Sequence, residues 1–502
     1  MISLKTEFKD VASIKSDALV VFVPSDDKKN KAAKRKLQTL LGKSVPQTSL
    51  DDVTGKIGET SIVYTSESFS SKRMIITGIG ESNKVTLEFL RRAGATAAKK
   101  AQSLKLASIS YINENFDNGT LEINESLEDI VCAVAEGAAL GTYKFSTYFS
   151  DEEQKTNPLK SVTFIAHSKK SLKQIDAGVK RALAISDGVY LARDLGNTPG
   201  LDLYPEKLAT AAQQECRKAG CKVTVFDQQK IKSLKMGGIL SVSKGSERPP
   251  RFIIIEWNGG KRTDKPYVLV GKGITFDTGG ISIKPSANMG AMKMDMSGAA
   301  AVIGTLKTAA ALKLPVNIVG LVPAAENMPS GTAIRPGDVV RIMDGKSVEV
   351  DNTDAEGRMI LADALVYAQR YKPKAVVDLA TLTGSCVVAL GHYATGMMGN
   401  DDDLIDALKS AGDSSYERVW ELPLYDEYEK LIKSDVADVK NVGGRWAGAI
   451  TAGWFLKKFT GDHPWVHLDI AGTAILEENG DYTQRGASGV GVRLLIEWLR
   501  SK

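Results

Sequence analysis

The sequence contains few cysteines and histidines for its length. Its 502 residues include four of each, and the cysteines (Cys132, Cys216, Cys221 and Cys386) form no C-x-x-C pair. We therefore expect neither a disulfide framework nor a structural zinc site, and a reducing compartment fits. The dispersed histidines, which form no H-E-x-x-H motif, are His167, His392, His463 and His467. A metal ion would have to be held mainly by oxygen.

Long hydrophobic runs are also absent. The N-terminal apolar run Ala18–Val23 ends at Pro24, so it is too short for a signal-peptide core or a membrane span. No other segment approaches about 18 uninterrupted apolar residues. We therefore expect a cytoplasmic protein with no membrane partner.

The chain carries only a small excess of positive charge. The formal net charge is +5, which is too little at this length to indicate a nucleic-acid partner by itself. Residues 28–36, KKNKAAKRK, form the strongest basic cluster. Such a run is typical of a solvated helix face, and contact with nucleic acid is the other interpretation. An additional DNA-binding or regulatory role through a basic N-terminal domain is therefore the alternative hypothesis.

What is present is the composition of an ordinary globular protein, with 43% apolar and 25% charged residues. The length suffices for two or three domains. Residues 1–165 predict a small α/β domain. Its expected strands are 17–24, 61–66 and 72–80, and its expected helices are 31–41, 86–104 and 126–140. A connecting helix or linker is predicted over 166–194, and a larger domain over 195–502.

The larger domain alternates apolar strands with helices. The expected strands are 222–227, 251–258, 267–277, 316–325, 375–384 and 465–472, and the expected helices include 297–312, 358–371 and 448–460. Continuous apolar strands separated by helices predict a mostly parallel sheet covered by helices on both faces. Ligands of such sheets bind beyond the carboxyl ends of the strands, so polar residues there are candidates for chemistry.

Four polar segments follow such strand ends. They contain, in turn, Lys272 and Asp277; Lys284, Lys293 and Asp295; Asp354, Glu356 and Arg358; and Asp378, Thr381 and Thr383. Their carboxylates suit hard divalent cations. A P-loop is excluded, because Pro266 stands where the first glycine before Gly271-Lys272 is required.

Each segment also has a simpler interpretation. The glycines after Asp277 could form a tight turn, and Asp295 could cap a helix that begins near Ser297. Asp354 and Glu356 could cap the helix 358–371 and complement its dipole. Taken singly, each motif favours the simpler interpretation. Four such motifs in succession at strand ends favour a metal site.

The third segment carries a family resemblance. Residues 352–359, NTDAEGRM, resemble the octapeptide NTDAEGRL of the leucyl (cytosol) aminopeptidase family, which includes bacterial aminopeptidase A. Only Met359 departs, by an exchange of one apolar side chain for another. The segments GKGITFDTGG, MKMDMSGAAAV, DLATLTG and GASGVGVRLL resemble other family blocks in the same order. The resemblance covers the chain from about Asp194 onward and is weaker in the N-terminal domain.

The resemblance implies a site for two divalent ions, manganese or zinc. The implied ligands are Lys272, Asp277, Asp295, Asp354 and Glu356, of which Asp277 and Glu356 bridge the two ions. Lys284 and Arg358 are the implied catalytic cations, and the arginine holds bicarbonate as a possible general base. The implied wall of the pocket for the first side chain is Met292, Thr381, Gly384 and Ala471.

The implied activity is metal-dependent removal of the N-terminal residue of peptides by a water activated between two metal ions. An apolar pocket would prefer leucine-like residues with broad specificity. Lys272 can ligate a metal only as a neutral amine, which burial and adjacent dications favour, whereas Lys284 should keep its charge. The family also implies a homo-hexamer.

Overall fold

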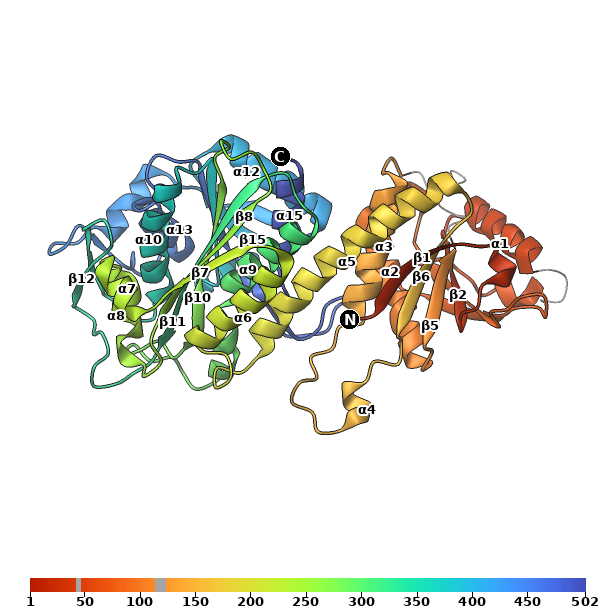
Figure 1. The fold of residues 1–502 in the computed structure, drawn as a ribbon, viewed down its shortest axis with the longest axis horizontal. Helices are drawn as coiled ribbons and strands as arrows, with labels where there is room; N and C mark the ends of the chain where they lie inside the picture. The colour runs from red at the N-terminus through yellow and green to blue at the C-terminus, as the bar shows by residue number, and fades with distance from the viewer. Residues whose placement is uncertain (42–46, 113–122) are drawn as a thin grey trace. The chain divides into compact units, whose positions relative to one another are not determined.

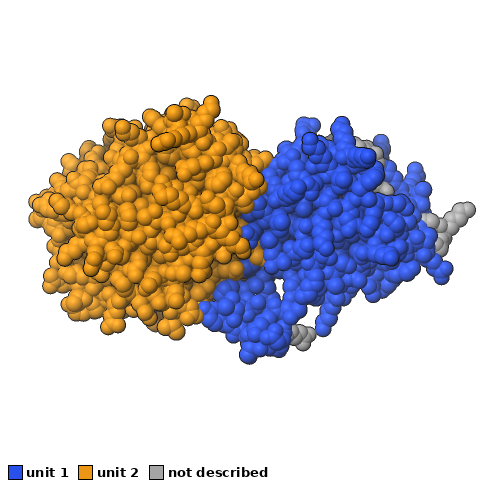
Figure 2. Space-filling model, in the orientation of Figure 1, with its two compact units in different colours: residues 1–187, 479–484 blue, residues 188–478, 485–502 orange. Residues whose placement is uncertain are grey.

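The chain divides into two compact units in the computed structural model, which describes residues 1–41, 47–112 and 123–502 (Figures 1 and 2). The first unit comprises residues 1–187 and 479–484, and the second comprises residues 188–478 and 485–502. Helix α5 (Lys169–Asn197) contributes residues to both units. The domain boundaries after residues 165 and 194 stay a prediction from the sequence. Among the described residues, no helix is both long enough and apolar enough to span a membrane.

The first unit is built on a six-stranded sheet in the order β1-β6-β5-β2-β4-β3. Its strands are β1 (Ser3–Phe8), β2 (Ala18–Val23), β3 (Thr60–Tyr64), β4 (Arg73–Gly78), β5 (Ser108–Ile112) and β6 (Ser161–Ala166). All neighbours are parallel except the edge strand β3, which is antiparallel to β4. Every residue of β2 is buried, as a continuous apolar run in the middle of a parallel sheet requires.

The helices of this unit include α1 (Asp27–Leu41), α2 (Leu87–Ser103), α3 (Leu127–Gly141) and α4 (Glu152–Lys155). Helix α1 carries the basic cluster. Its buried side chains are Asn30, Ala33, Leu37 and Leu41, while Lys28, Lys31, Arg35 and Lys36 are exposed and Lys29 is partly exposed. This division between a buried and a charged face is that of a solvated amphipathic helix.

The second unit contains a nine-stranded sheet in the order β16-β15-β18-β14-β9-β11-β8-β7, with β10 paired to β11. The strands are β7 (Lys222–Phe226), β8 (Arg251–Asn258), β9 (Tyr267–Gly271), β10 (Gly273–Asp277), β11 (Asn317–Asn327), β14 (Ala375–Ala380), β15 (Thr395–Gly399), β16 (Val419–Glu421) and β18 (Trp465–Asp469). The central strands β18, β14, β9 and β11 are parallel, and β8 and β15 join them antiparallel. The mostly parallel sheet predicted from the sequence is confirmed.

Helices cover both faces of this sheet, as predicted (Figure 1). One face carries α6 (Pro205–Ala219), α9 (Ser297–Ala311) and α15 (Val492–Arg500), and the other carries α8 (Gly237–Val242), α10 (Glu356–Ala368) and α13 (Gly448–Lys457). Side chains of the second helix group pack with the sheet in one apolar core that includes Val270, Leu321, Ile360 and Phe455. This packing fixes the start of α10 near the strand ends.

Short elements complete the second unit. The helices are α7 (Gln228–Ser233), α11 (Gly384–Leu390), α12 (Asp402–Ser415) and α14 (Ala471–Ala474). The short strands β12 (Val339–Arg341), β13 (Ser347–Glu349) and β17 (Val439–Lys440) form one small sheet, and β19 (Ile475–Leu476) pairs with β20 (Gly486–Ala487). Strand β13 leads directly into the acidic segment that precedes α10.

Candidate active site

A cavity of about 1410 Å³ opens in the second unit. It is lined by all the site residues that the family resemblance implied: Lys272, Asp277, Lys284, Met292, Asp295, Asp354, Glu356, Arg358, Thr381, Gly384 and Ala471. The structure therefore brings together residues that are up to about 200 positions apart in the chain.

The topology of the sheet explains why these residues meet. Lys272 follows β9, Asp277 ends β10, Thr381 follows β14, and Ala471 lies just beyond β18. Since the central strands are parallel, their carboxyl ends share one edge of the sheet. Glu356 is added by the first turn of α10, which packs on that sheet.

Two lining residues come from the segment between β10 and α9. Met292 belongs to a 3-10 helix, Met289–Met294, and Asp295 ends it. Asp295 does not cap α9, because the N-cap residue is Met296 and no side-chain cap bond is present. Asp354 likewise does not cap α10, whose N-cap residue is Ala355. Neither aspartate therefore caps a helix, whereas Glu356 lies in the first turn of α10, where an acidic side chain complements the helix dipole.

The centre of the cavity is a cluster of three carboxylates. Asp277, Asp354 and Glu356 each offer one oxygen, and these oxygens lie within 4.8 Å of one another. Burial raises the pKa of Glu356 to about 8, and the charge of Asp277 adds to that rise. Burial also raises the pKa of Asp354. Three crowded anions of this kind are costly to hold without a compensating cation.

The donor atoms fit a hard divalent cation. The Oε2 atom of Glu356 is buried and has no hydrogen-bond partner among the described residues. Asp295 stands beside the cluster, and burial raises its pKa to about 6. Carboxylate oxygens in this number are the ligands that such ions take in proteins.

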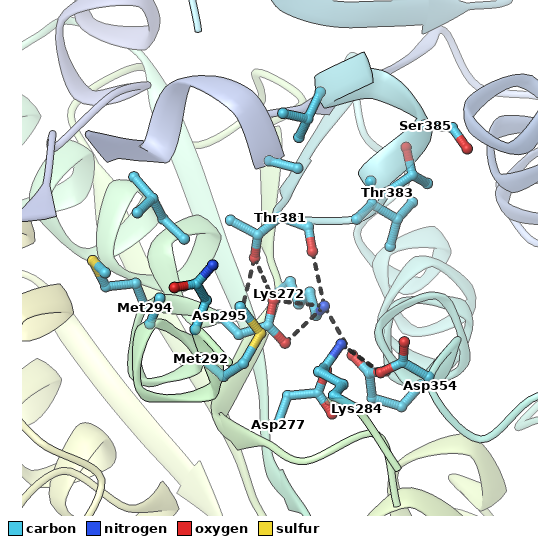
Figure 3. Close-up of a pocket in the computed structure, with 18 of the residues that line it drawn as sticks. Lys272, Asp277, Lys284, Met292, Met294, Asp295, Asp354, Thr381, Thr383 and Ser385 are labelled. Atoms are coloured by element: carbon cyan, nitrogen blue, oxygen red, sulfur yellow. Dashed lines mark hydrogen bonds and ion pairs between the residues drawn. The ribbon is translucent and has the colours of Figure 1, made fainter. Parts of the chain in front are cut away.

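Two lysines neutralise part of this charge (Figure 3). The Lys272 Nζ atom lies 2.8 Å from Asp295 Oδ2 and 2.8 Å from Glu356 Oε1, and it donates to the backbone oxygen of Thr381 at 2.9 Å. The Lys284 Nζ atom lies 2.8 Å from Asp277 Oδ2 and also pairs with Asp354. Both lysines therefore point into the carboxylate cluster.

The protonation of Lys272 depends on the charges that surround it. Burial lowers the pKa of Lys272, but the charges of Asp295 and Glu356 outweigh burial and hold the pKa above its usual value. The ammonium form is therefore the one that these carboxylates favour. A dication on the same carboxylates would have to displace that proton before Lys272 could become a ligand.

Arg358 is a buried cation without a carboxylate partner in the described part of the chain. Its Nη1 atom donates to the backbone oxygen of Asn441 at 2.6 Å, and its Nε atom has no hydrogen-bond partner there. Burial lowers the pKa of Arg358 to about 10. A guanidinium still charged at neutral pH and lining a cavity suits a small anion.

The remaining wall is made of residues around the ends of β14 and β18. Thr381 donates its hydroxyl to Asp295 Oδ1 at 2.7 Å, and Thr383 donates its hydroxyl to Asp469 Oδ2 at 2.7 Å. Both hydroxyls are thus bonded within the protein. Met292, Gly384, Val387 and Ala471 add apolar or side-chain-free surface.

Two further residues of the polar segments, Asp378 and Lys293, do not belong to the carboxylate cluster. Asp378 does not line the cavity. It is fully buried in the sheet, where it accepts from Trp465 Nε1 at 2.7 Å and contacts His467 Nδ1 at 2.6 Å. Lys293 lines the cavity and donates to the backbone oxygen of Asn197 at 2.8 Å.

Sequence reasoning missed two asparagines that hold the site. The buried Asn441 accepts from the backbone N–H groups of Asp351 and Asn352 at 2.9 and 3.3 Å, and it donates to the oxygen of Asn352 at 2.7 Å. No pattern near Asn441 indicates this role. Asn327 ends β11 and donates to Asp277. Its place at a strand end is a signal that could have selected it.

Comparison with known proteins identifies relatives over nearly the whole chain. Residues 190–496 match the family described as "Cytosol aminopeptidase family, catalytic domain", and residues 20–152 match the N-terminal domain of that family. A probable cytosol aminopeptidase of Geobacter sulfurreducens is 43% identical and covers 99% of each chain. One of Geobacter sp. (strain M21) is 46% identical over 90% of each chain.

Solved structures are also similar to this chain over nearly its whole length. A mutant form of tomato leucine aminopeptidase has a TM-score of 0.85 at 31% identity and covers 100% of this chain and 97% of its own. The bottromycin maturation enzyme BotP in complex with Mn has a TM-score of 0.84 at 32% identity and covers 97% of this chain and 99% of its own. Both similarities extend over both units of the fold.

Proposed function

The chain belongs to the cytosol aminopeptidase family and is a metallo-aminopeptidase, and on that premise we propose that it removes leucine-like N-terminal residues from peptides, with broad specificity. The observation that carries the proposal is the cluster of Asp277, Asp354 and Glu356 with its two lysines. The alternative DNA-binding role gains no support, because the matched family and relatives are named as peptidases.

We propose that two divalent ions, Mn²⁺ or Zn²⁺, bind this cluster. Lys272, Asp277, Asp295, Asp354 and Glu356 would hold these ions. The close carboxylate oxygens and the unbonded Oε2 atom of Glu356 support this assignment. When bound, the ions would polarise the scissile carbonyl and lower the pKa of a water toward neutrality.

Lys284 would stabilise the negative charge that develops on the carbonyl oxygen during attack. Burial lowers the pKa of Lys284, but the charge of Asp277 outweighs it and raises the pKa above its usual value, so the side chain stays an ammonium at neutral pH. Its side chain is 22% exposed, which leaves it accessible from the cavity. This accessibility distinguishes Lys284 from Lys272, whose side chain is 4% exposed.

Arg358 would hold a bicarbonate that serves as general base. Its guanidinium has an unbonded Nε atom, and its Nη1 atom is fixed by Asn441. Arginine binds such planar anions through two parallel N–H groups. A fixed guanidinium would therefore hold a proton acceptor in one orientation beside the cluster.

The pocket for the first side chain would be formed by Met292, Thr381, Gly384 and Ala471. Since the hydroxyl of Thr381 is bonded to Asp295 and that of the neighbouring Thr383 is bonded to Asp469, the wall offers little to a polar side chain. One methylene in an apolar pocket discriminates by only ~1–3 kcal/mol, so several apolar residues should be accepted.

We also propose that the enzyme acts in the cytoplasm as a homo-hexamer. The location is supported by the names of the relatives and by the four free cysteines, all buried. The oligomer follows from the family resemblance, and mass measurement by light scattering would test it.

The aminopeptidase activity is tested with a free and a blocked N-terminus. We expect leucine p-nitroanilide to be hydrolysed and N-acetyl-leucine p-nitroanilide to be inert, because the free amine is the group by which a metal-bound site selects the terminal residue. Mass spectrometry of a peptide digest should show losses of single N-terminal residues. Equal cleavage of the acetylated compound would contradict the proposal.

A further inference from the structure

Strand β11 ends at Asn327, a buried residue with 2% exposure to which the family resemblance assigned no role and which bonds to the cavity residue Asp277. We propose that Asn327 is a positioning residue for the metal cluster: it fixes the carboxylate of Asp277 and ties the Asp277 loop to the turn that bears Asp354. The inference rests on the metal role proposed above for these two aspartates.

The side chain of Asn327 uses both amide protons. Its Nδ2 atom donates to Asp277 Oδ1 at 2.8 Å and to the backbone oxygen of Thr353 at 3.1 Å. Both partners can only accept, so the nitrogen and not the oxygen of the amide must face them. One side chain thus binds the end of β10 and the residue immediately before Asp354.

These bonds determine the orientation of Asp277. Its Oδ1 atom also accepts from the backbone N–H of Gly279 at 2.9 Å, so two donors hold that oxygen. The other oxygen, Oδ2, lies 2.8 Å from Lys284 Nζ in the cavity. A carboxylate held through one oxygen presents the other in a fixed direction, which is how outer hydrogen bonds orient metal ligands.

The two segments that Asn327 joins also pack tightly against each other. Thr353 donates its hydroxyl to the backbone oxygen of Gly279 at 2.7 Å and accepts from Ser282 N at 2.8 Å. Gly280 has a φ of +67°, and a Cβ atom there would lie 2.8 Å from Asn327 Oδ1. The separation of Asp277 and Asp354 is therefore set by a small region in which Asn327 contacts both sides.

The competing explanation is that the hydrogen bonds of Asn327 only stabilise the end of strand β11 and do not affect metal binding. The chain provides its own comparison at the other end of β11. Asn317 is 8% exposed and donates to the backbone oxygens of Lys261 and Asp264 at 2.7 and 3.0 Å. It is the same residue type on the same strand with the same number of donated bonds, but neither residue that it bonds to lines the cavity, whereas Asp277 does.

The experiment compares Mn²⁺ binding by calorimetry for chelator-treated wild type, Asn327→Ala, Asn327→Asp and Asn317→Ala. Both Asn327 variants should bind Mn²⁺ about 10–100-fold more weakly, and Asn317→Ala should stay within about 2-fold of wild type. Asn327→Asp is the decisive variant. Its added negative charge would by itself strengthen cation binding, so weaker binding must come from the loss of the amide donor. Melting temperatures without metal show that each variant is folded, and if Asn327→Ala does not fold, the isosteric Asn327→Asp decides.

Wild-type affinity in Asn327→Asp, or an equal loss in Asn317→Ala, would overturn the positioning role alone. Wild-type protein that binds no Mn²⁺ would overturn the proposed metal cluster and the inference with it. Because the readout is metal affinity, the result does not depend on which peptide the enzyme prefers.

Discussion

The ammonium of Lys284 lies 2.8 Å from the Oδ2 atom of Asp277, and the same nitrogen pairs with Asp354. The lysine is therefore a positive charge in direct contact with two carboxylates that we assign to metal ions. Its predicted function is nevertheless to stabilise the reacting carbonyl. Neutralising the carboxylates and stabilising the carbonyl are separate roles, and a substitution of Lys284 distinguishes them.

Replacing Lys284 with methionine should slow turnover without loss of metal. We expect kcat to fall by about 10²–10³-fold, since this is the effect of removing one donor to a developing oxyanion. Mn²⁺ affinity should not weaken, because a competing cation leaves Asp277. Lys293→Met is the matched control, since Lys293 lines the cavity but bonds only to the backbone of Asn197 in the described structure. Loss of bound Mn²⁺ in Lys284→Met would show instead that the lysine is a metal ligand.

Replacing Asp354 with asparagine should remove metal and activity together. Loss of one of three clustered carboxylates should weaken Mn²⁺ binding by at least about 100-fold, the upper end of what outer hydrogen-bond partners contribute. Asp351→Asn is the control in the same turn, because Asp351 is exposed and lies 3.8 Å from Lys440. Calorimetry and steady-state rates of both variants decide. Equal effects at the two positions would contradict the assigned ligand.

Arg358 should make the rate depend on bicarbonate. In buffer freed of carbon dioxide, added bicarbonate should raise the rate of the wild type and leave that of Arg358→Lys unchanged, because lysine cannot present two parallel N–H groups. Bound Mn²⁺ should be retained in the variant. A bicarbonate response that is identical in the two proteins would show that the anion binds elsewhere.

The buried pair of His467 and Asp378 should make stability depend on pH. Burial lowers the pKa of His467, but the charge of Asp378 outweighs it and raises the pKa above its usual value. A folded pKa above the unfolded one gives stability that is complete below the unfolded pKa of about 6.5 and is lost as the pH rises through the folded pKa.

Urea unfolding at several pH values between about 6 and about 9 should therefore show a fall in the free energy of unfolding that is smaller in His467→Asn. His463→Asn is the control, because His463 lies partly exposed just before the same strand. The same slope in wild type and His467→Asn would show that the pair contributes no pH dependence.

Much of the fold was accessible from sequence because the central strands are continuous apolar runs. The segment 267–277 was nevertheless predicted as one strand and is two, β9 and β10, with Lys272 between them. The backbone N–H of Lys272 bonds to Leu379 of β14, while β10 pairs with β11. This change of partner depends on a strand about 100 residues away, which no local pattern contains.

The site could be predicted from the sequence to a similar degree. The ligand candidates stand at strand ends, where a polar residue after an apolar run is conspicuous, and the octapeptide around Asp354 strengthened the choice. Asn441 is different, because its partner Asp351 lies 90 residues earlier and its own surroundings, VKNVGG, carry no chemical signature. The protonation of Lys272 also depends on Asp295 and Glu356, which only the folded chain places beside it.

The central claim is that peptide hydrolysis requires metal ions held by the cluster of Asp277, Asp354 and Glu356. The most direct measurement pairs elemental analysis with leucine p-nitroanilide hydrolysis before chelation, after chelation and after addition of Mn²⁺ or Zn²⁺. We predict about two ions per chain in the active protein, loss of activity with the metal, and recovery of both on addition. Undiminished hydrolysis by protein shown to be free of metal would contradict the account.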